Sequence, residues 1–114
     1  MSVIIKIFIN ERRIIIMTIN KTQENEKLTV SIEGRLDTTT APQLEAEIKS
    51  SLDNVKELVF DIKNLEYVSS AGLRVLLTAQ KIMNKQGKMT VTGASEAVME
   101  IFEVTGFIDI LNIE

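Results

Sequence analysis

Two adjacent serines stand where the sequence changes from a strand pattern to a helix pattern. Ser69 and Ser70 follow the apolar run of residues 58–62 and precede a helical pattern that covers about residues 71–86. A helix start presents free backbone N–H groups and the positive end of the helix dipole. A serine there either caps the helix through its hydroxyl or carries a phosphate that the helix start stabilises. Position alone favours the cap, because Ser is a preferred N-cap residue.

The composition excludes the common forms of catalysis at this serine pair. The chain of 114 residues contains no cysteine and no histidine. It therefore has no thiolate nucleophile, no disulfide framework and no imidazole to act as a general base, so a Ser-His-Asp triad is impossible. No G-x-x-x-x-G-K-[ST] loop is present to cradle a nucleotide phosphate. The sequence predicts a protein that is not an enzyme and that uses no cofactor and no metal.

Charge and hydropathy describe one globular domain of ordinary size. Hydrophobic residues make up 45% of the chain, which is enough for a core, and charged residues make up 25%. The net charge is -3. A nucleic-acid binder needs a basic surplus to meet phosphates, and this chain has none, so we expect no nucleic-acid partner.

The first sixteen residues differ from the rest of the chain. Residues 3–9 and 14–16 are apolar runs that flank a polar stretch at residues 10–13. Neither run approaches the roughly 20 residues that span a bilayer, and the order of charges does not fit a signal peptide, so we expect no membrane insertion. Three interpretations stay open: a β-hairpin that turns at residues 10–13, an arm that binds a membrane surface or a partner, or an addition to the natural product. The last is favoured, and the predicted domains are residues 1–16 and 17–114.

From residue 17 onward, strand and helix patterns alternate. The pattern predicts an α/β fold with a mixed sheet of four to five strands and about three to four helices, in the order β-β-α-β-α-β-α. The expected strands cover residues 17–20, 28–33, 58–62 and 88–93, and the three clearest helices follow residue 40, residue 70 and residue 95.

Several local features support this order. Gly34 ends an alternating strand and indicates a bulge, and residues 21–27 are predicted to be a polar connection. Thr40 and Gln43 fit a capping box at the start of the first helix. Residues 107–111 form an apolar tail that is expected to be an edge strand or a strap over the core.

Two polar features leave a structural and a functional interpretation open. Asp61 interrupts an apolar strand, and it either hydrogen-bonds the following loop, which we favour, or places a carboxylate near Ser70. A polar stripe at helical spacing follows Ser70, and it is either a solvated face or a docking face for an acidic partner. The stripe consists of Arg74, Thr78, Lys81 and Lys85.

The residues around the serine pair also resemble a known family. The run LVFDI at residues 58–62, followed by LEYVSSAGLRVLL at residues 65–77, resembles the signature of the STAS domain, and more narrowly that of bacterial anti-sigma factor antagonists. The run GRLD at residues 34–37, with Ala-Pro at residues 41–42, resembles the same family before its first helix. The resemblance covers about residues 17–111 and implies a single STAS-like domain.

The resemblance implies a partner switch in the cytoplasm. Such proteins bind an anti-sigma factor, often an ATP-dependent serine kinase, and thereby release a sigma factor. The kinase phosphorylates one serine at the helix start and breaks the complex, and a metal-dependent, PP2C-like phosphatase restores it. That serine corresponds to Ser70, and Ser69, which stands where many members have aspartate, is the second candidate.

The same resemblance implies a binding surface around the modified serine. We expect a monomer or a weak dimer, since the Ile- and Val-rich residues near the N-terminus could pair if they are exposed. The predicted partner-binding residues are Asp37, Thr38, Ser69, Ser70, Ala71, Gly72, Arg74, Thr78 and Lys81. An alternative function stays open, in which the STAS domain is a binding module of a stress-signalling or lipid-transport complex without control of a sigma factor.

Overall fold

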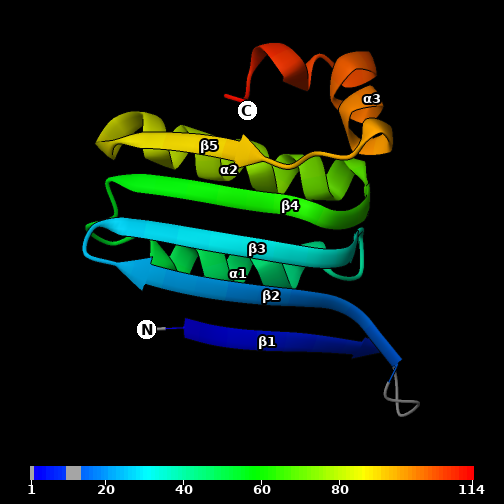
Figure 1. Cartoon of the computed structure of the whole chain (residues 1–114), viewed down its shortest axis with the longest axis horizontal. Coiled ribbons are helices and arrows are strands. Elements are labelled where there is room, and N and C mark those ends of the chain that lie inside the picture. The colour runs from blue at the N-terminus through cyan, green and yellow to red at the C-terminus, as the bar shows by residue number, and fades with distance from the viewer. Residues whose placement is uncertain (1, 10–13) are drawn as a thin grey trace.

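A computed structural model describes residues 2–9 and 14–114 as one mixed five-stranded sheet with helices packed against it (Figure 1). The elements in chain order are β1 (Ser2–Ile9), β2 (Ile14–Glu24), β3 (Lys27–Leu36), α1 (Ala41–Ser51), β4 (Glu57–Val68), α2 (Ser70–Gln86), β5 (Lys88–Thr92), α3 (Glu96–Thr105) and the 3₁₀ helix η2 (Phe107–Asp109). The predicted fold class is confirmed, with five strands and three α-helices in the described residues.

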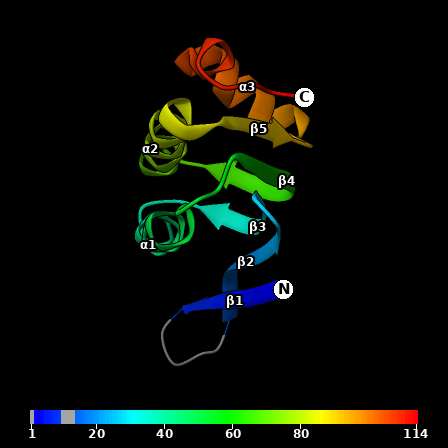
Figure 2. The same ribbon diagram turned by 90° about the vertical axis from the view of Figure 1, so that its left-hand side faces the viewer.

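The strands lie in the same order in the sheet as in the chain. β1, β2 and β3 pair antiparallel, whereas β3, β4 and β5 pair parallel and are joined by crossovers through α1 and α2. Both crossover helices lie on one side of the sheet (Figure 2), as expected when each right-handed crossover steps in the same direction. α3 packs against β4 and η2 beyond the β5 edge of the sheet.

The core lies between the sheet and the crossover helices. Cross-strand neighbours such as Ile19 and Ile32, or Val30 and Phe60, are almost fully buried on the face that α1 and α2 cover. Strand residues one position away point to the opposite face, because side chains alternate along a strand. The core therefore lies on one side of the sheet. The parallel strands β3 and β4 have their carboxyl ends at the same end of the sheet.

The predicted polar connection at residues 21–27 is wrong. β2 continues to Glu24, and only Asn25 and Glu26 form the turn to β3. The polar residue that misled the prediction, Lys21, points to the helix side of the sheet. Its Nζ lies 2.6 Å from a carboxylate oxygen of Glu47 and 2.9 Å from the hydroxyl of Ser51, both on α1. An ion pair with a distant element thus allows a lysine in a half-buried strand position.

The predicted capping box at Thr40 is also wrong. Thr40 precedes α1, but its side chain makes no capping hydrogen bond to the helix. Instead its hydroxyl donates to the backbone oxygen of Arg35 at 2.8 Å and accepts from the amide of Asp37 at 2.8 Å. The buried hydroxyl therefore holds the loop between β3 and α1. The predicted bulge near Gly34 is confirmed, because the register with β4 shifts between Gly34 and Arg35.

β4 and the C-terminal tail differ from their predicted shapes. β4 runs to Val68, far beyond the predicted end at residue 62, so Ser69 follows the strand directly. The tail is a 3₁₀ turn rather than an edge strand at residues 107–111, and strand-like pairing occurs only later, where Ile113 bridges to Val91. The buried side chain of Leu111 keeps the strap interpretation valid.

The N-terminal segment forms an added edge strand in this structure. β1 pairs with β2 from Ser2 opposite Thr22 to Ile9 opposite Ile14. The turn predicted at residues 10–13 lies outside the described residues. The division of the chain at residue 17 stays a prediction, although β2 itself crosses that boundary.

Candidate functional site

The start of α2 is tied to the end of β3 through Ser69. The backbone amide of Ser69 donates to the oxygen of Leu36 at 2.8 Å. Its hydroxyl accepts from the amide of Gly72 at 3.3 Å, and its backbone oxygen accepts from the amide of Leu73 at 2.8 Å. With φ of -90° and ψ of 176°, Ser69 has the extended backbone of an N-cap residue. The capping interpretation of the serine pair therefore applies to Ser69.

Ser70 occupies a different environment one residue later. It is the first residue of α2 and its side chain is exposed, whereas Ser69 is half-buried. Within residues 2–9 and 14–114, no side-chain hydrogen bond of Ser70 is present. Its hydroxyl is therefore the one of the pair that a second protein can reach without breaking the helix cap.

Gly72 lets α2 approach β3 and β4 closely. A Cβ at this position would lie 2.7 Å from Cγ of Leu36, 2.8 Å from Cγ2 of Val68 and 2.9 Å from the backbone oxygen of Leu36. These distances are shorter than any carbon–carbon or carbon–oxygen contact that packing tolerates. Only glycine fits, and the close approach fixes the position of the Ser70 hydroxyl relative to the sheet.

Asp37 organises the loop that faces the start of α2. Its Oδ1 accepts from the hydroxyl of Thr39 at 2.7 Å and from the amides of Thr39 and Thr40 at 3.0 and 3.3 Å. The Thr39 hydroxyl is the largest influence lowering the pKa of Asp37, desolvation opposes it, and the two amides lower the pKa further. Asp37 is thus a structural carboxylate of the loop, and Thr38 beside it is exposed.

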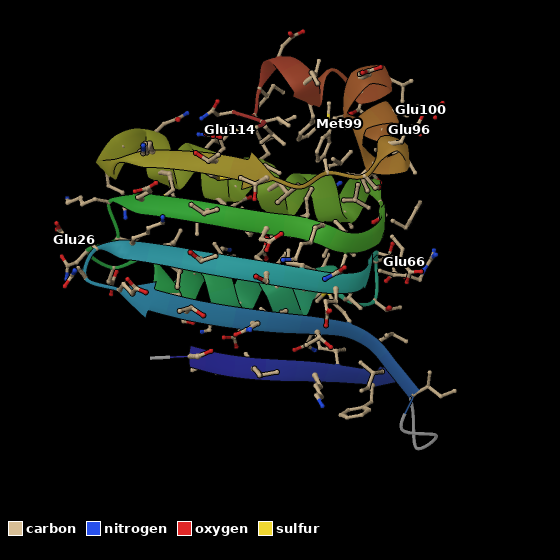
Figure 3. The ribbon with its side chains drawn as sticks, viewed as in Figure 1. Glu26, Glu66, Glu96, Met99, Glu100 and Glu114 are labelled. Carbon is tan, nitrogen blue, oxygen red and sulfur yellow. The ribbon has the colours of Figure 1, made fainter. Side chains whose placement is uncertain are left out.

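A shallow groove of about 260 Å³ joins this loop to α2. It is lined by Thr38, Ala71 and the exposed Arg74, all three of which were predicted to bind a partner. The remaining lining residues are Ala41, Pro42, Glu45 and Val75. The structure therefore brings most of the predicted binding residues to one edge of the sheet, the edge marked by Glu66 in Figure 3.

The predicted residues further along α2 lie outside this groove. Thr78 donates its hydroxyl to the backbone oxygen of Arg74 at 3.0 Å, and Lys81 is exposed one turn later. Both line a separate hollow of about 250 Å³ with Lys85. The polar stripe of α2 is therefore a solvent-facing surface that continues from the groove.

Asp61 does not lie near Ser70, where one interpretation of the sequence had placed it. Asp61 lies within β4, seven residues before its end, and its carboxylate accepts from the amide of Lys63 at 3.2 Å. The Nζ of Lys63 is 3.6 Å from the other carboxylate oxygen. Its structural interpretation holds, but the bonded residue belongs to the strand and not to a loop. Residues 2–9 and 14–114 include no group of three acidic, His or Cys side chains arranged for a metal ion.

Sequence reasoning missed a contact between Arg35 and Tyr67 at the same edge. The guanidinium carbon lies 4.5 Å from the centre of the Tyr67 ring, and Nε lies 3.7 Å from a carboxylate oxygen of Asp37. Arg35 and Tyr67 lie opposite each other in the pairing of β3 with β4. This pairing depends on the two register shifts between the strands, so the spacing of residues in the sequence does not predict the contact.

The family follows from comparison with known proteins. The model of the STAS domain family matches residues 18–114. The chain belongs to the STAS domain family. A protein of Bordetella bronchiseptica, BtrV, that is assigned as an anti-sigma factor antagonist is 38% identical over 85 residues, which cover 73% of each chain.

Solved structures agree with this family. An anti-sigma factor antagonist from Mycobacterium paratuberculosis has a TM-score of 0.77 and 26% identity, and the match covers 85% of this chain and 84% of that one. The Bacillus cell fate determinant SpoIIAA in its phosphorylated form shares the fold, with a TM-score of 0.67 at 16% identity over 84% of this chain and 90% of that one. No helix in residues 2–9 and 14–114 has the length and hydropathy to cross a membrane.

Proposed function

We propose that this protein is an anti-sigma factor antagonist that binds through the start of α2 and is switched off by phosphorylation of Ser70. The observation that carries the proposal is the different use of the two hydroxyls. Ser69 accepts from the Gly72 amide and caps the helix, whereas Ser70 is exposed and its side chain makes no hydrogen bond to the described residues. The resemblance of the surrounding sequence to anti-sigma factor antagonists supplies the partner class.

A phosphate on Ser70 would be accepted locally without unfolding the domain. Phosphorylation adds a charge of about -1.5 to -2, and a helix start stabilises such a charge through its dipole. Arg74 follows one turn later on α2, and no ion pair of Arg74 is found in the part of the chain that the structure describes. Its guanidinium is therefore available to the phosphate at the i, i+4 spacing.

The same charge would act strongly on a bound partner. The groove between α1 and α2 combines apolar surface at Pro42 and Ala71 with the charges of Glu45 and Arg74. A partner docked over Ser70 and the neighbouring groove desolvates this surface, so a phosphate on Ser70 repels an acidic patch and raises the desolvation cost of an apolar one. The switch needs no catalytic residue here, because an anti-sigma factor with serine-kinase activity adds the phosphate and a PP2C-like phosphatase removes it.

The first test is site mapping on the protein isolated from its native cells. Intact mass is measured before and after phosphatase treatment, and the modified residue is identified by fragmentation. A phosphate on Ser70 supports the proposal. A phosphate on Ser69 keeps the switch but moves it, and it would require the α2 cap to open first. No phosphate in any growth condition leaves a binding module without this control.

The second test compares charge variants as bait in lysates of the native cells. Ser70→Asp is expected to fold normally and to lose capture of a protein with an ATP-binding serine-kinase domain, whereas Ser70→Ala retains it. Ser50→Asp is the matched control, because Ser50 is exposed near the end of α1, away from the groove. Equal capture by Ser70→Asp and Ser50→Asp would contradict the switch.

A further inference from the structure

Most of the exposed apolar side chains that the structure describes lie on β1 and the start of β2. Eight large hydrophobic side chains are exposed in residues 2–8 and 14–114, and three of them lie elsewhere, at Tyr67, Val104 and Ile110. The other five lie in β1 and at the start of β2: Val3 (43% exposed), Ile4 (60%), Phe8 (40%), Ile14 (52%) and Ile15 (47%). Such a concentration marks an interaction surface more often than a scatter of single residues does.

The two outer strands of the sheet, β1 and β5, differ in what lies beside them. β5 is flanked by the C-terminal segment, where the amide of Val91 donates to the oxygen of Asn112 and the amide of Glu114 donates to the oxygen of Val91, both at 2.9 Å. β1 is the outermost strand on the other side, with β2 as its neighbour in the sheet (Figure 1). An outer strand of eight residues offers a row of backbone groups that only another extended strand matches.

The side chains of β1 are apolar on both faces. Val3, Ile5 and Ile7 point to the helix side of the sheet, and Ile4 and Phe8 lie on the open side. A long apolar edge strand is a template for pairing with another strand, and many edge strands are protected from such pairing by charges, prolines and bulges. β1 has one charge, Lys6, one register shift after Ile7, and no proline.

We propose that β1 pairs antiparallel with β1 of a second copy of this chain, about a two-fold axis at Ile5. In an antiparallel pair, opposite side chains point to the same face of the sheet. Both helix layers therefore lie on the same side only when helix-side residues of one copy lie opposite helix-side residues of the other. An axis at Lys6 would set two lysines opposite each other, and an axis at Ile4 would shorten the overlap. The axis at Ile5 pairs Val3 with Ile7 and Ile4 with Lys6 of the second copy.

The apolar side chains of β1 favour a second copy over an acidic partner strand. Lys6 is the one charged residue of β1, and in the Ile5 register the apolar helix-side residues Val3, Ile5 and Ile7 lie opposite one another. The pairing leaves the surface around Ser70 free, because β2 and β3 separate β1 from β4 (Figure 1). This inference is therefore independent of the proposed function, and Ser70→Asp is expected to leave the dimer unchanged.

Cysteine cross-linking tests the register directly, since the chain contains no cysteine. Opposite Cα atoms of an antiparallel pair lie about 4.5–5.5 Å apart, which suits a disulfide. Ile5→Cys is expected to form a disulfide-linked dimer under air oxidation. Ile7→Cys is the matched control on the same face and strand, where the two sulfurs would be about 14 Å apart along the strands and stay reduced.

Charge variants test the same register without a covalent bond. In the Ile5 register, Ile4→Lys sets two pairs of like charges opposite each other, and Ile4→Glu sets two opposite-charge pairs. Cross-strand charge pairs of this kind change the dimer dissociation constant by about tenfold in total, so Ile4→Lys is expected to bind itself about tenfold more weakly than Ile4→Glu. The double variant Ile4→Lys with Lys6→Glu is expected to restore the affinity.

Sedimentation equilibrium of the full chain and these variants decides between the outcomes. The proposal is supported if the chain forms a concentration-dependent dimer, if Ile5→Cys cross-links faster than Ile7→Cys, and if Ile4→Lys associates more weakly than Ile4→Glu. A wild-type chain that stays monomeric up to millimolar concentration overturns it. Equal weakening by Ile4→Lys and Ile4→Glu, or cross-linking of Ile7→Cys as fast as Ile5→Cys, also overturns the proposed pairing.

Discussion

The start of α2, which packs on the sheet, and β1, which is an outer strand of the sheet, are built in opposite ways. At the start of α2, Gly72 packs against Leu36 and Val68, and Ser69 makes three hydrogen bonds to its surroundings. In residues 2–8 of β1, side chains on both faces are half-buried or exposed, and apart from its pairing with β2 the strand contacts the core only through Ile5 and Ile7 among the described side chains. The start of α2 therefore presents the exposed Ser70 hydroxyl on closely packed, hydrogen-bonded support, whereas β1 exposes a whole strand.

This difference teaches how one small domain can support two kinds of recognition. A switch residue works best when its hydroxyl alone is available and its support does not move, because a change of charge then alters the surface and not the fold. An edge strand recognises its partner through many backbone groups, and its own flexibility matters less. The following predictions test this contrast through stability, from the largest expected effect to the smallest.

The largest loss is expected for Gly72→Ala. The added methyl group would meet the backbone oxygen of Leu36 at 2.9 Å, so α2 must shift, and we expect a loss of about 3 kcal/mol. Gly106→Ala is the control, because no atom lies within 4 Å of its Cβ position and only its φ of 81° opposes the change. We expect about 1 kcal/mol there. Urea unfolding measures both, and equal losses would mean that α2 is not closely packed.

Removal of residues 1–13 is expected to be the next largest effect. Ile5 and Ile7 are half-buried against the core, and a fully buried isoleucine contributes about 1.5–3 kcal/mol, so we expect a loss of about 2 kcal/mol in all. Thermal unfolding at low protein concentration separates this loss from any effect of self-association. An unchanged melting temperature would show that β1 does not contribute to the core.

Ser69→Ala is expected to cost about 1 kcal/mol, because the Gly72 amide loses its cap. Ser95→Ala is the matched control, since Ser95 caps α3 through the amide of Val98 at 3.2 Å. Both losses are measured by urea unfolding. If Ser69→Ala costs far less than Ser95→Ala, the Ser69 hydroxyl is free and our distinction between the two serines fails.

The smallest effect concerns the charge of Asp37. Its pKa in the folded protein lies below the value of the unfolded chain, so its contribution to stability is fully present above about pH 4 and is lost as the pH falls through the folded pKa. We expect wild type to be slightly more stable than Asp37→Asn at pH 7, and the gap to close toward pH 2. A gap that widens in acid would reverse the assigned direction.

Periodic patterns predicted the parts of the fold that depend on neighbours in sequence. The spacing of apolar residues in α2 predicted its extent. The helix predicted to follow residue 95 is confirmed, and it begins with a hydrogen bond from the Val98 amide to the Ser95 hydroxyl. Such features form over one or two turns of chain, so the sequence contains the information locally.

The errors arose where a distant element changed the role of a residue. Lys21 belongs to β2 because Glu47 on α1 pairs with it, and Thr40 bonds Arg35 and Asp37 although its sequence fits a helix cap. Tertiary contacts override a local preference when they satisfy the same polar group in a different way.

By itself, the sequence determined the class of fold, the absence of histidine and cysteine chemistry, and the position of a serine pair at a helix start. Only the tertiary structure decided which serine is engaged and which is exposed. Ser69 is held because the end of β3 lies within hydrogen-bond distance of its amide, and Ser70 turns outward because Gly72 brings α2 against the sheet. The reason is physical: burial and hydrogen bonding depend on neighbours that are more than thirty residues away in the chain.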